Sequence, residues 1–165
     1  MKRVVRPICL FRLSVAAVSA GFALTSSAVH TGTEAALTVV AGDAVTWGAA
    51  PPSLPSGAQA SVLHGNPAQD GPFVLRLKFP AGFVVPPHRH SKDELVTVIS
   101  GKFAVINGEQ VDRSKFRALA PGSFVNIPAG TSHYAMAETE TVVQINGSGP
   151  FDITYLNMKD DPRAQ

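Results

Sequence analysis

Short apolar runs separated by turn residues dominate the chain from about residue 58 onward. The runs are rich in Val, Ile, Leu and Phe, with Gly, Pro and Asn between them, which is typical of short β-strands joined by turns. Outside the N-terminal segment, no window shows a clear 3.6-residue amphipathic period. About ten short strands at this spacing predict an all-β sandwich or barrel. The predicted strands are 59–64, 73–79, 82–88, 94–100, 102–107, 116–119, 123–127, 132–137, 141–146 and 151–157.

Turn signals divide this pattern further. Asn107-Gly108 predicts a two-residue hairpin because both residues tolerate positive φ, and Ser100-Gly101 predicts another tight reversal. Upstream, 38–40 and 44–47 are predicted as short edge strands, and a Pro-rich loop follows at 51–57. We therefore expect an N-terminal extension over 29–57, a barrel over 58–157 and a C-terminal tail over 158–165.

The first 28 residues differ sharply from the rest. Lys2, Arg3 and Arg6 precede an apolar run over 13–24, and small residues follow up to Ala28. A basic head, about 7–15 apolar residues and a small-x-small exit are typical of a secretory signal peptide. The uncharged stretch over 13–28 is short for a membrane-spanning helix, which needs about 20 apolar residues. We expect cleavage after Ala28 and a periplasmic or secreted mature protein.

Cleavage changes the charge and the cysteine content. The 165-residue chain has fourteen Lys and Arg against twelve Asp and Glu, and the removed segment takes four basic and no acidic residues. The mature chain would keep ten basic against twelve acidic residues, a balance that argues against a nucleic-acid surface. Cys9, the single cysteine, lies in the removed segment, so the mature domain would hold no disulfide. Cleavage would also remove the apolar run, so we expect no stable membrane insertion of the mature protein.

Two histidines and a carboxylate fall within seven residues, His88-x-His90-x-x-x-Glu94. Side chains two apart on a strand share a face, so His88 and His90 are expected to point the same way. Glu94 keeps that parity if the strand resumes in register after the turn at 91–93. Two imidazoles and one carboxylate that converge on a point form a transition-metal site that lacks at least one ligand.

Two spaced patterns surround this cluster. The first is Gly82, five residues, His88-x-His90, three residues, Glu94, six residues and Gly101. After a gap of twenty residues, the second is Gly122, five residues, Pro128-x-Gly130, two residues and His133. The chain thereby resembles the cupin superfamily, in particular small single-domain bacterial cupins of the RmlC-like type, over roughly residues 58–157. Ala137 departs from the pattern, because the second motif usually ends in an Asn there, which is not a metal ligand in the family.

The resemblance implies a jelly-roll barrel, or double-stranded β-helix, with one divalent transition metal inside. Its ligands would be His88, His90, Glu94 and His133, so His133 supplies the missing ligand. Such ligands suit Fe or Mn, which we favour, and also Ni, Cu, Co or Zn. An octahedral ion would keep two positions for water, O₂ or a chelating substrate. Pro86 and Pro87 cannot donate ladder hydrogen bonds and predict a bulged strand. Gly82, Gly101 and Gly130 are expected where a Cβ would clash.

Three functions remain open for such a site, because one fold supports many activities. One is a dioxygenase-like oxidoreductase acting on a small chelating substrate, with Glu94 as the catalytic proton acceptor. Another is a non-redox isomerase, lyase or decarboxylase. A third is a non-catalytic periplasmic protein that binds a small molecule or a metal. A homodimer is compatible with each.

Side chains that can line the substrate pocket are Arg76, Phe83, Phe103, Phe124, Tyr134 and Met136, although core packing accounts for the aromatic ones and the methionine equally well. Arg76 shares a strand face with Lys78, and the pair forms either solvated outer-face charges or a clamp for a substrate carboxylate. The chain lacks a Gly-x-Ser-x-Gly elbow, a phosphate loop and a dinucleotide fingerprint.

Overall fold

The computed structural model describes residues 36–164, and the strands belong to one compact unit that begins at Thr38. The expected signal peptide and its cleavage site lie outside the described residues. Within 36–164, the helical segments are single turns of 3-10 helix, and none is long and apolar enough to cross a membrane. These turns are η1 (Gly42–Ala44), η2 (Arg113–Lys115), η3 (Met158–Asp160) and η4 (Pro162–Ala164).

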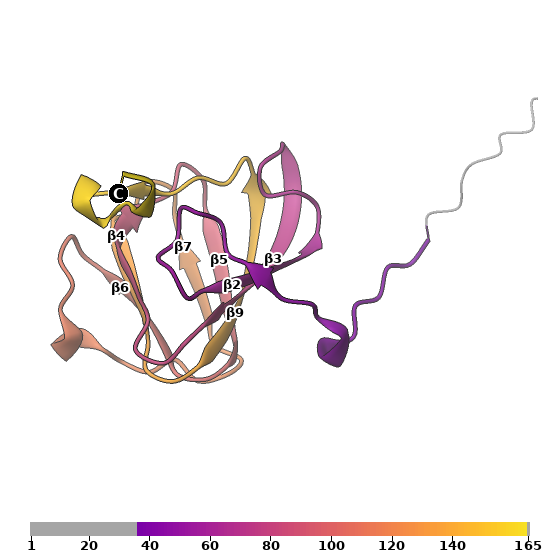
Figure 1. Ribbon diagram of the computed structural model, residues 1–165, viewed down its shortest axis with the longest axis horizontal. Coiled ribbons are helices and arrows are strands. Elements are labelled where there is room, and N and C mark those ends of the chain that lie inside the picture. The colour runs from indigo at the N-terminus through magenta and orange to yellow at the C-terminus, as the bar shows by residue number, and fades with distance from the viewer. Residues whose placement is uncertain (1–35, 165) are drawn as a thin grey trace, which may run out of the picture. The chain divides into compact units, whose positions relative to one another are not determined.

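Two antiparallel sheets form the fold, which confirms the all-β prediction (Figure 1). One has six strands in the order β1-β2-β3-β9-β5-β7, and the other has four in the order β10-β4-β8-β6. The strands are β1 (Gly48–Ala49), β2 (Gln59–His64), β3 (Gly71–Phe79), β4 (Val84–Arg89), β5 (Glu94–Ser100), β6 (Phe103–Asn107), β7 (Phe124–Ile127), β8 (His133–Ala137), β9 (Thr141–Gly149) and β10 (Thr154–Tyr155).

The core lies between the inner faces of the two sheets. Along β3, every second residue from Phe73 to Phe79 is buried, as expected for a strand with one face toward a core. Phe79 stacks on Phe83 and Phe103, with ring centroids 4.9 and 5.9 Å apart. Burial of each such side chain stabilises the fold by about 1.5–3 kcal/mol. The Phe79–Phe103 contact joins β3 of one sheet to β6 of the other.

Four predicted elements differ from the structure. The predicted strands at 38–40 and 44–47 are absent, and the first strand is instead β1, which pairs with β2. The predicted strand at 116–119 is reduced to a single bridge between Leu119 and Phe103. The predicted hairpin at Asn107-Gly108 is wrong, because β6 pairs with β8, a strand that comes later in the chain.

Strand β4 carries a bulge at the two prolines, as the sequence predicted. Its register with β8 runs from Val85 opposite Ala135 to His88 opposite His133, so three steps on β4 match two on β8. Pro86 and Pro87 occupy the shifted positions, where the missing N–H groups remove no ladder hydrogen bond. The bulge places Val85 and His88 on the same inner wall although they are three residues apart.

Gly101 is required for two separate reasons. Its φ is +86°, a left-handed conformation that costs other residues about 1–2 kcal/mol. A Cβ there would also overlap the Glu140 carbonyl oxygen and lie 2.5 Å from Thr141 Oγ1. Gly82 and Gly130 have positive φ as well, but a Cβ at either would meet nothing within 4 Å. The predicted clash is therefore right for Gly101 and wrong for the other two.

We predict that Gly101→Ala lowers the free energy of unfolding by clearly more than Gly122→Ala. Gly122 is the matched control, since its φ is +88° and a Cβ there meets nothing within 4 Å. The control should lose about 1–2 kcal/mol from the backbone conformation alone. Urea denaturation measures both losses, and equal losses would contradict the steric role assigned to Gly101.

Candidate metal centre

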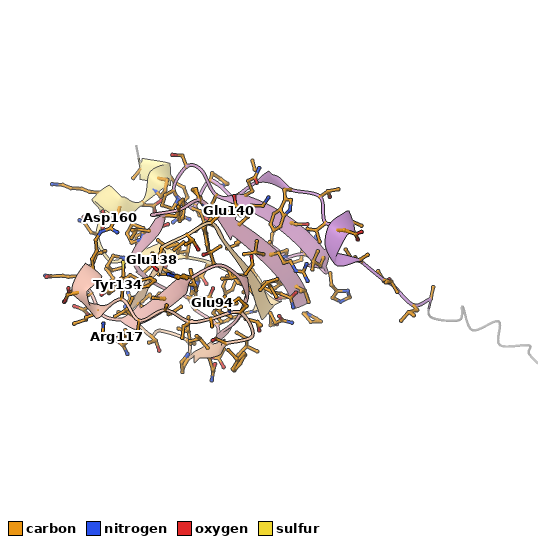
Figure 2. The ribbon with its side chains drawn as sticks, turned by 90° about the horizontal axis from the view of Figure 1, so that it is seen from below. Glu94, Arg117, Tyr134, Glu138, Glu140 and Asp160 are labelled. Carbon is orange, nitrogen blue, oxygen red and sulfur yellow. The ribbon has the colours of Figure 1, made fainter. Side chains whose placement is uncertain are left out.

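The four predicted ligands come together from both sheets. His88 lies on β4 directly opposite His133, the first residue of β8, and His90 follows the end of β4. Glu94 is the first residue of β5, in the other sheet, and lies inside the barrel (Figure 2). The parity argument for Glu94 is therefore wrong, because the chain crosses between sheets at 91–93 instead of resuming the same strand. The residue reaches the same interior from the opposite wall.

The ligand atoms of His88, His90, Glu94 and His133 all lie within 4.8 Å of one another, and each residue is buried. The imidazole of His88 is central, with ring centroids 4.2 Å from His133 and 4.9 Å from His90. Glu94 Oε2 lies 3.3 Å from His90 Nε2 and 3.4 Å from His133 Nε2. One carboxylate oxygen thus faces two imidazole nitrogens across a small gap.

Backbone carbonyl groups orient the three imidazoles. Each Nδ1–H donates to a carbonyl oxygen: His88 to Pro86 at 2.6 Å, His133 to Thr131 at 3.0 Å, and His90 to Asp152. A carbonyl oxygen can only accept, so these bonds place the proton on Nδ1 and leave the Nε2 lone pair available. The arrangement is typical of histidines that bind a metal through Nε2.

The pKa values of the cluster residues are those of side chains able to bind a cation. Burial lowers the pKa of His88 to about 3, with a further contribution from nearby His133, so this imidazole is neutral at pH 7. Burial alone would raise the pKa of Glu94, but the His133 and His90 imidazoles lower it to about 2. Burial opposes protonation of His90, yet the Glu94 carboxylate raises its pKa. The cluster therefore offers a carboxylate and at least one neutral imidazole.

One buried atom supports a metal at this point. His90 Nε2 is the buried side-chain nitrogen or oxygen that has no hydrogen-bond partner within residues 36–164. Buried polar atoms without partners are costly, so such an atom calls for a specific explanation. A divalent cation among the four ligand atoms would satisfy this nitrogen and use the Glu94 charge. The donor set suits Fe, Mn, Co, Ni, Cu or Zn.

A small cavity of about 50 Å³ surrounds the ligand atoms, which is room for an ion and a few water molecules. Its remaining walls are apolar side chains, among them the predicted pocket residue Phe103. Leu54 and Ile153 also line it and were not singled out from the sequence. The available signal for Leu54 was an apolar residue inside a Pro- and Ser-rich loop.

The other predicted pocket residues lie elsewhere. Phe83 packs on Phe79 in the core. Tyr134 and Met136 project from the other face of β8: the Tyr134 hydroxyl group donates to the Asp112 carbonyl oxygen at 3.1 Å (Figure 2 labels Tyr134), and Met136 lies beside Arg113 and Phe116. Phe124 is 61% exposed on β7.

Arg76 lies outside both the small cavity and the core face of β3. Its Nε donates to Gln144 Oε1 at 3.1 Å, and its neighbours Leu75 and Leu77 face the interior in its place. Lys78, on the same face, holds its ammonium group 4.5 Å from the Trp47 ring centroid. The two residues therefore lie on the outer face of β3, away from the ligand cluster.

We predict that the purified protein binds one divalent transition metal per chain, and that His133→Ala and Glu94→Ala lose it. Each change removes one of the four buried metal ligands. His64→Ala is the matched control, because His64 is exposed on β2 and lies outside the cluster. Elemental analysis after dialysis measures the content, and full occupancy in both ligand variants would show that the site is wrongly assigned.

Comparisons with known proteins agree with this fold. A comparison with curated protein sequences gives no match. Among solved structures, the chain is similar to KdgF from Halomonas sp., with 24% identity, a TM-score of 0.52, and coverage of 69% of this chain and 96% of that one. It is similar to the polyketide cyclase RemF from Streptomyces resistomycificus, with 16% identity, a TM-score of 0.62, and coverage of 77% and 90%.

A third similar structure is a provisionally assigned acetylacetone dioxygenase from Methylibium petroleiphilum PM1, with 19% identity, a TM-score of 0.59, and coverage of 79% and 88%. The chain is also similar to an RmlC-like cupin from Shewanella frigidimarina NCIMB 400, with 18% identity, a TM-score of 0.52, and coverage of 68% and 91%. Likeness at these identities establishes the fold, which is that of the RmlC-like cupins. Residues 38–164 match the family model described as "Domain of unknown function (DUF4437)". The chain therefore belongs to the DUF4437 family and has a cupin fold.

Proposed function

We propose that the protein is a metal-dependent oxidoreductase of the dioxygenase type that acts on a small organic substrate able to chelate the metal. The observation that carries this proposal is the buried set of three histidines and Glu94, whose free ligand atoms face one another inside an apolar barrel. Fe or Mn is the metal that we favour, because both support redox chemistry with carboxylate and imidazole ligands.

The three histidines would hold the metal through Nε2, and Glu94 would hold it through its carboxylate. A bound metal would act as a Lewis acid toward an enol-type substrate and bring it together with O₂. In a dioxygenase reaction, both oxygen atoms of one O₂ enter the organic product. The substrate is oxidised as O₂ is reduced, so the reaction needs no external reductant.

Glu94 has a second role in this proposal, as the acceptor of the substrate's enol proton. It is the acidic side chain in the wall of the cavity, and it is ionised at neutral pH because its pKa is about 2. A carboxylate with so low a pKa is a weak base. Proton transfer would therefore require Glu94 to loosen both from the metal and from the His133 and His90 imidazoles that lower its pKa.

The apolar wall supports the oxygenase over a reaction that needs several acid–base groups. Val85, Phe103, Ile127 and Ile145 stand around the ligands and would exclude bulk water from the reacting atoms. Electrostatic interactions inside such a wall are stronger than in water. These residues would therefore shield both the reactive enolate and O₂ from solvent.

A non-redox lyase, isomerase or decarboxylase is the second candidate. The names of the similar structures favour neither class, since they include both a polyketide cyclase and an assigned dioxygenase. A metal acting as a Lewis acid in the same cavity would serve either reaction. A non-catalytic binding protein would use the same ligands and show no turnover.

We also propose that the protein is exported, on the basis of its N-terminal basic and apolar segment. The mature chain would begin at Val29. Mass spectrometry of protein from the native host tests the cleavage, and a chain that keeps residues 1–28 would contradict the cleavage after Ala28.

We predict that the Fe- or Mn-loaded protein consumes O₂ in the presence of a 1,3-dicarbonyl compound from a substrate panel. Glu94→Gln keeps the size of the side chain but removes its charge, and it should lower the rate by about 10²–10⁴-fold. An oxygen electrode measures consumption, and metal content is measured in parallel. Turnover of a panel compound without O₂ uptake would favour the non-redox candidate and contradict the oxygenase.

A further inference from the structure

A second and larger cavity of about 550 Å³ adjoins the metal centre. Its walls come from the segment 49–54, from β2 and β3, and from the segments 66–68 and 151–153. The lining is mostly apolar, with Ala60, Val62, Leu75 and Leu77 on the sheet side. Cavities of this size and character are typical of small-molecule sites.

This cavity meets the small cavity around the ligands at a shared wall. Leu54, His90 and Ile153 line both cavities. Because His90 is a predicted metal ligand, a molecule in the large cavity would lie beside one residue of the metal centre. Leu54 and Ile153 are apolar side chains that separate the two spaces, so they are positioned to select what passes.

Specific contacts hold this wall in place. The Tyr155 hydroxyl group donates to the Ser53 carbonyl oxygen at 2.7 Å, and Leu54 N donates to the Pro51 carbonyl oxygen at 2.9 Å. Ser91 donates from its backbone N and its hydroxyl group to Asp152 Oδ1, at 2.9 and 2.6 Å. The segment that carries Leu54 is thus tied to Tyr155 on β10, the strand that pairs with β4. The segment that carries Ile153 is tied to Ser91, the residue after His90.

We propose that the large cavity binds the apolar body of the substrate, and that the substrate's chelating oxygen atoms reach the metal past Leu54 and Ile153. This rests on the function proposed above and adds the substrate class: a small molecule with a chelating 1,3-dicarbonyl end and a hydrocarbon tail. The tail contacts Ala60, Val62, Leu75 and Leu77, and it supplies the affinity that a short chelator lacks.

The test uses Zn²⁺-loaded protein, because Zn²⁺ supports no redox turnover of a bound diketone. Calorimetry gives the dissociation constants of pentane-2,4-dione and octane-2,4-dione. Each buried methylene should tighten binding by about fourfold, so octane-2,4-dione should bind tens of times more tightly than pentane-2,4-dione. The ratio of the two constants is the measured quantity, since it cancels the contribution of the chelating end.

Three variants identify the place where the tail binds. Ala60→Phe fills the cavity and should reduce the ratio toward one. Val62→Asp puts a charge on the wall of the large cavity and should also reduce the ratio. The variant should fold, because the Val62 side chain is 52% exposed. Ser61→Phe is the matched control on the other face of β2, where the ratio should stay as in the original chain.

The outcomes separate the two proposals. The cavity proposal would be overturned if the two diketones bound the original chain with equal affinity. It would also be overturned if Ala60→Phe and Val62→Asp left the ratio of the two dissociation constants unchanged. In either case the metal-dependent function would stand. Failure of every diketone to bind would remove the chelating substrate from the proposed function.

In that case octan-1-ol, titrated into the same protein, still tests the cavity. Methyl resonances of Val62, Leu75 and Leu77 should shift, and unchanged resonances would overturn the proposal. A second copy of the chain seated in the cavity would make the affinity ratio depend on protein concentration, which would also overturn it.

Discussion

The burial of Glu94 with three histidines in an apolar barrel is the constraint on which the rest of the site depends. A buried charge is tolerated only when it is paired and its hydrogen-bonding groups are satisfied. Here the carbonyl oxygens of Pro86, Thr131 and Asp152 satisfy the outer nitrogen of each imidazole. The inner nitrogens face one another and Glu94, and among the described residues His90 Nε2 has no hydrogen-bond partner. A cation at this point would bind the unpartnered His90 Nε2 and offset the buried negative charge of Glu94.

The backbone is arranged to produce this convergence. A bulge at Pro86-Pro87 turns His88 inward opposite His133, and the crossover at 91–93 starts β5 in the facing sheet with Glu94. Asp152 links the site to the C-terminal part of the chain, because its carbonyl oxygen accepts from His90 while its side chain accepts from Ser91. A residue far away in sequence therefore orients His90, whereas carbonyl groups two residues away orient His88 and His133. Ile153, which follows Asp152, also forms part of the wall between the two cavities.

The sequence was sufficient to predict the all-β class, most strand positions and the four residues of the cluster. The spacing of His88, His90, Glu94 and His133 carried that information, together with the resemblance to cupins. Strand parity alone failed for Glu94, since a tight crossover between sheets and a continued strand have the same sequence signature. The hairpin at Asn107-Gly108 failed because the partner of β6 comes from later in the chain.

The pocket residues were harder to predict, for a physical reason. Strand β8 is buried on both faces, so its sequence does not alternate between apolar and polar residues. Tyr134 and Met136 could not be distinguished from the inward-facing His133 and Ala135 by pattern. The cavity wall from Leu54 and Ile153 depends on long-range contacts of two loops, and local sequence contains no record of such contacts.

Anomalous X-ray diffraction from crystals of the metal-loaded protein tests the central claim most directly. We predict one strong peak bonded to Nε2 of His88, His90 and His133 and to a carboxylate oxygen of Glu94, at about 2.0–2.2 Å. A peak elsewhere in the chain, or coordination through Nδ1 with the backbone hydrogen bonds broken, would contradict the account.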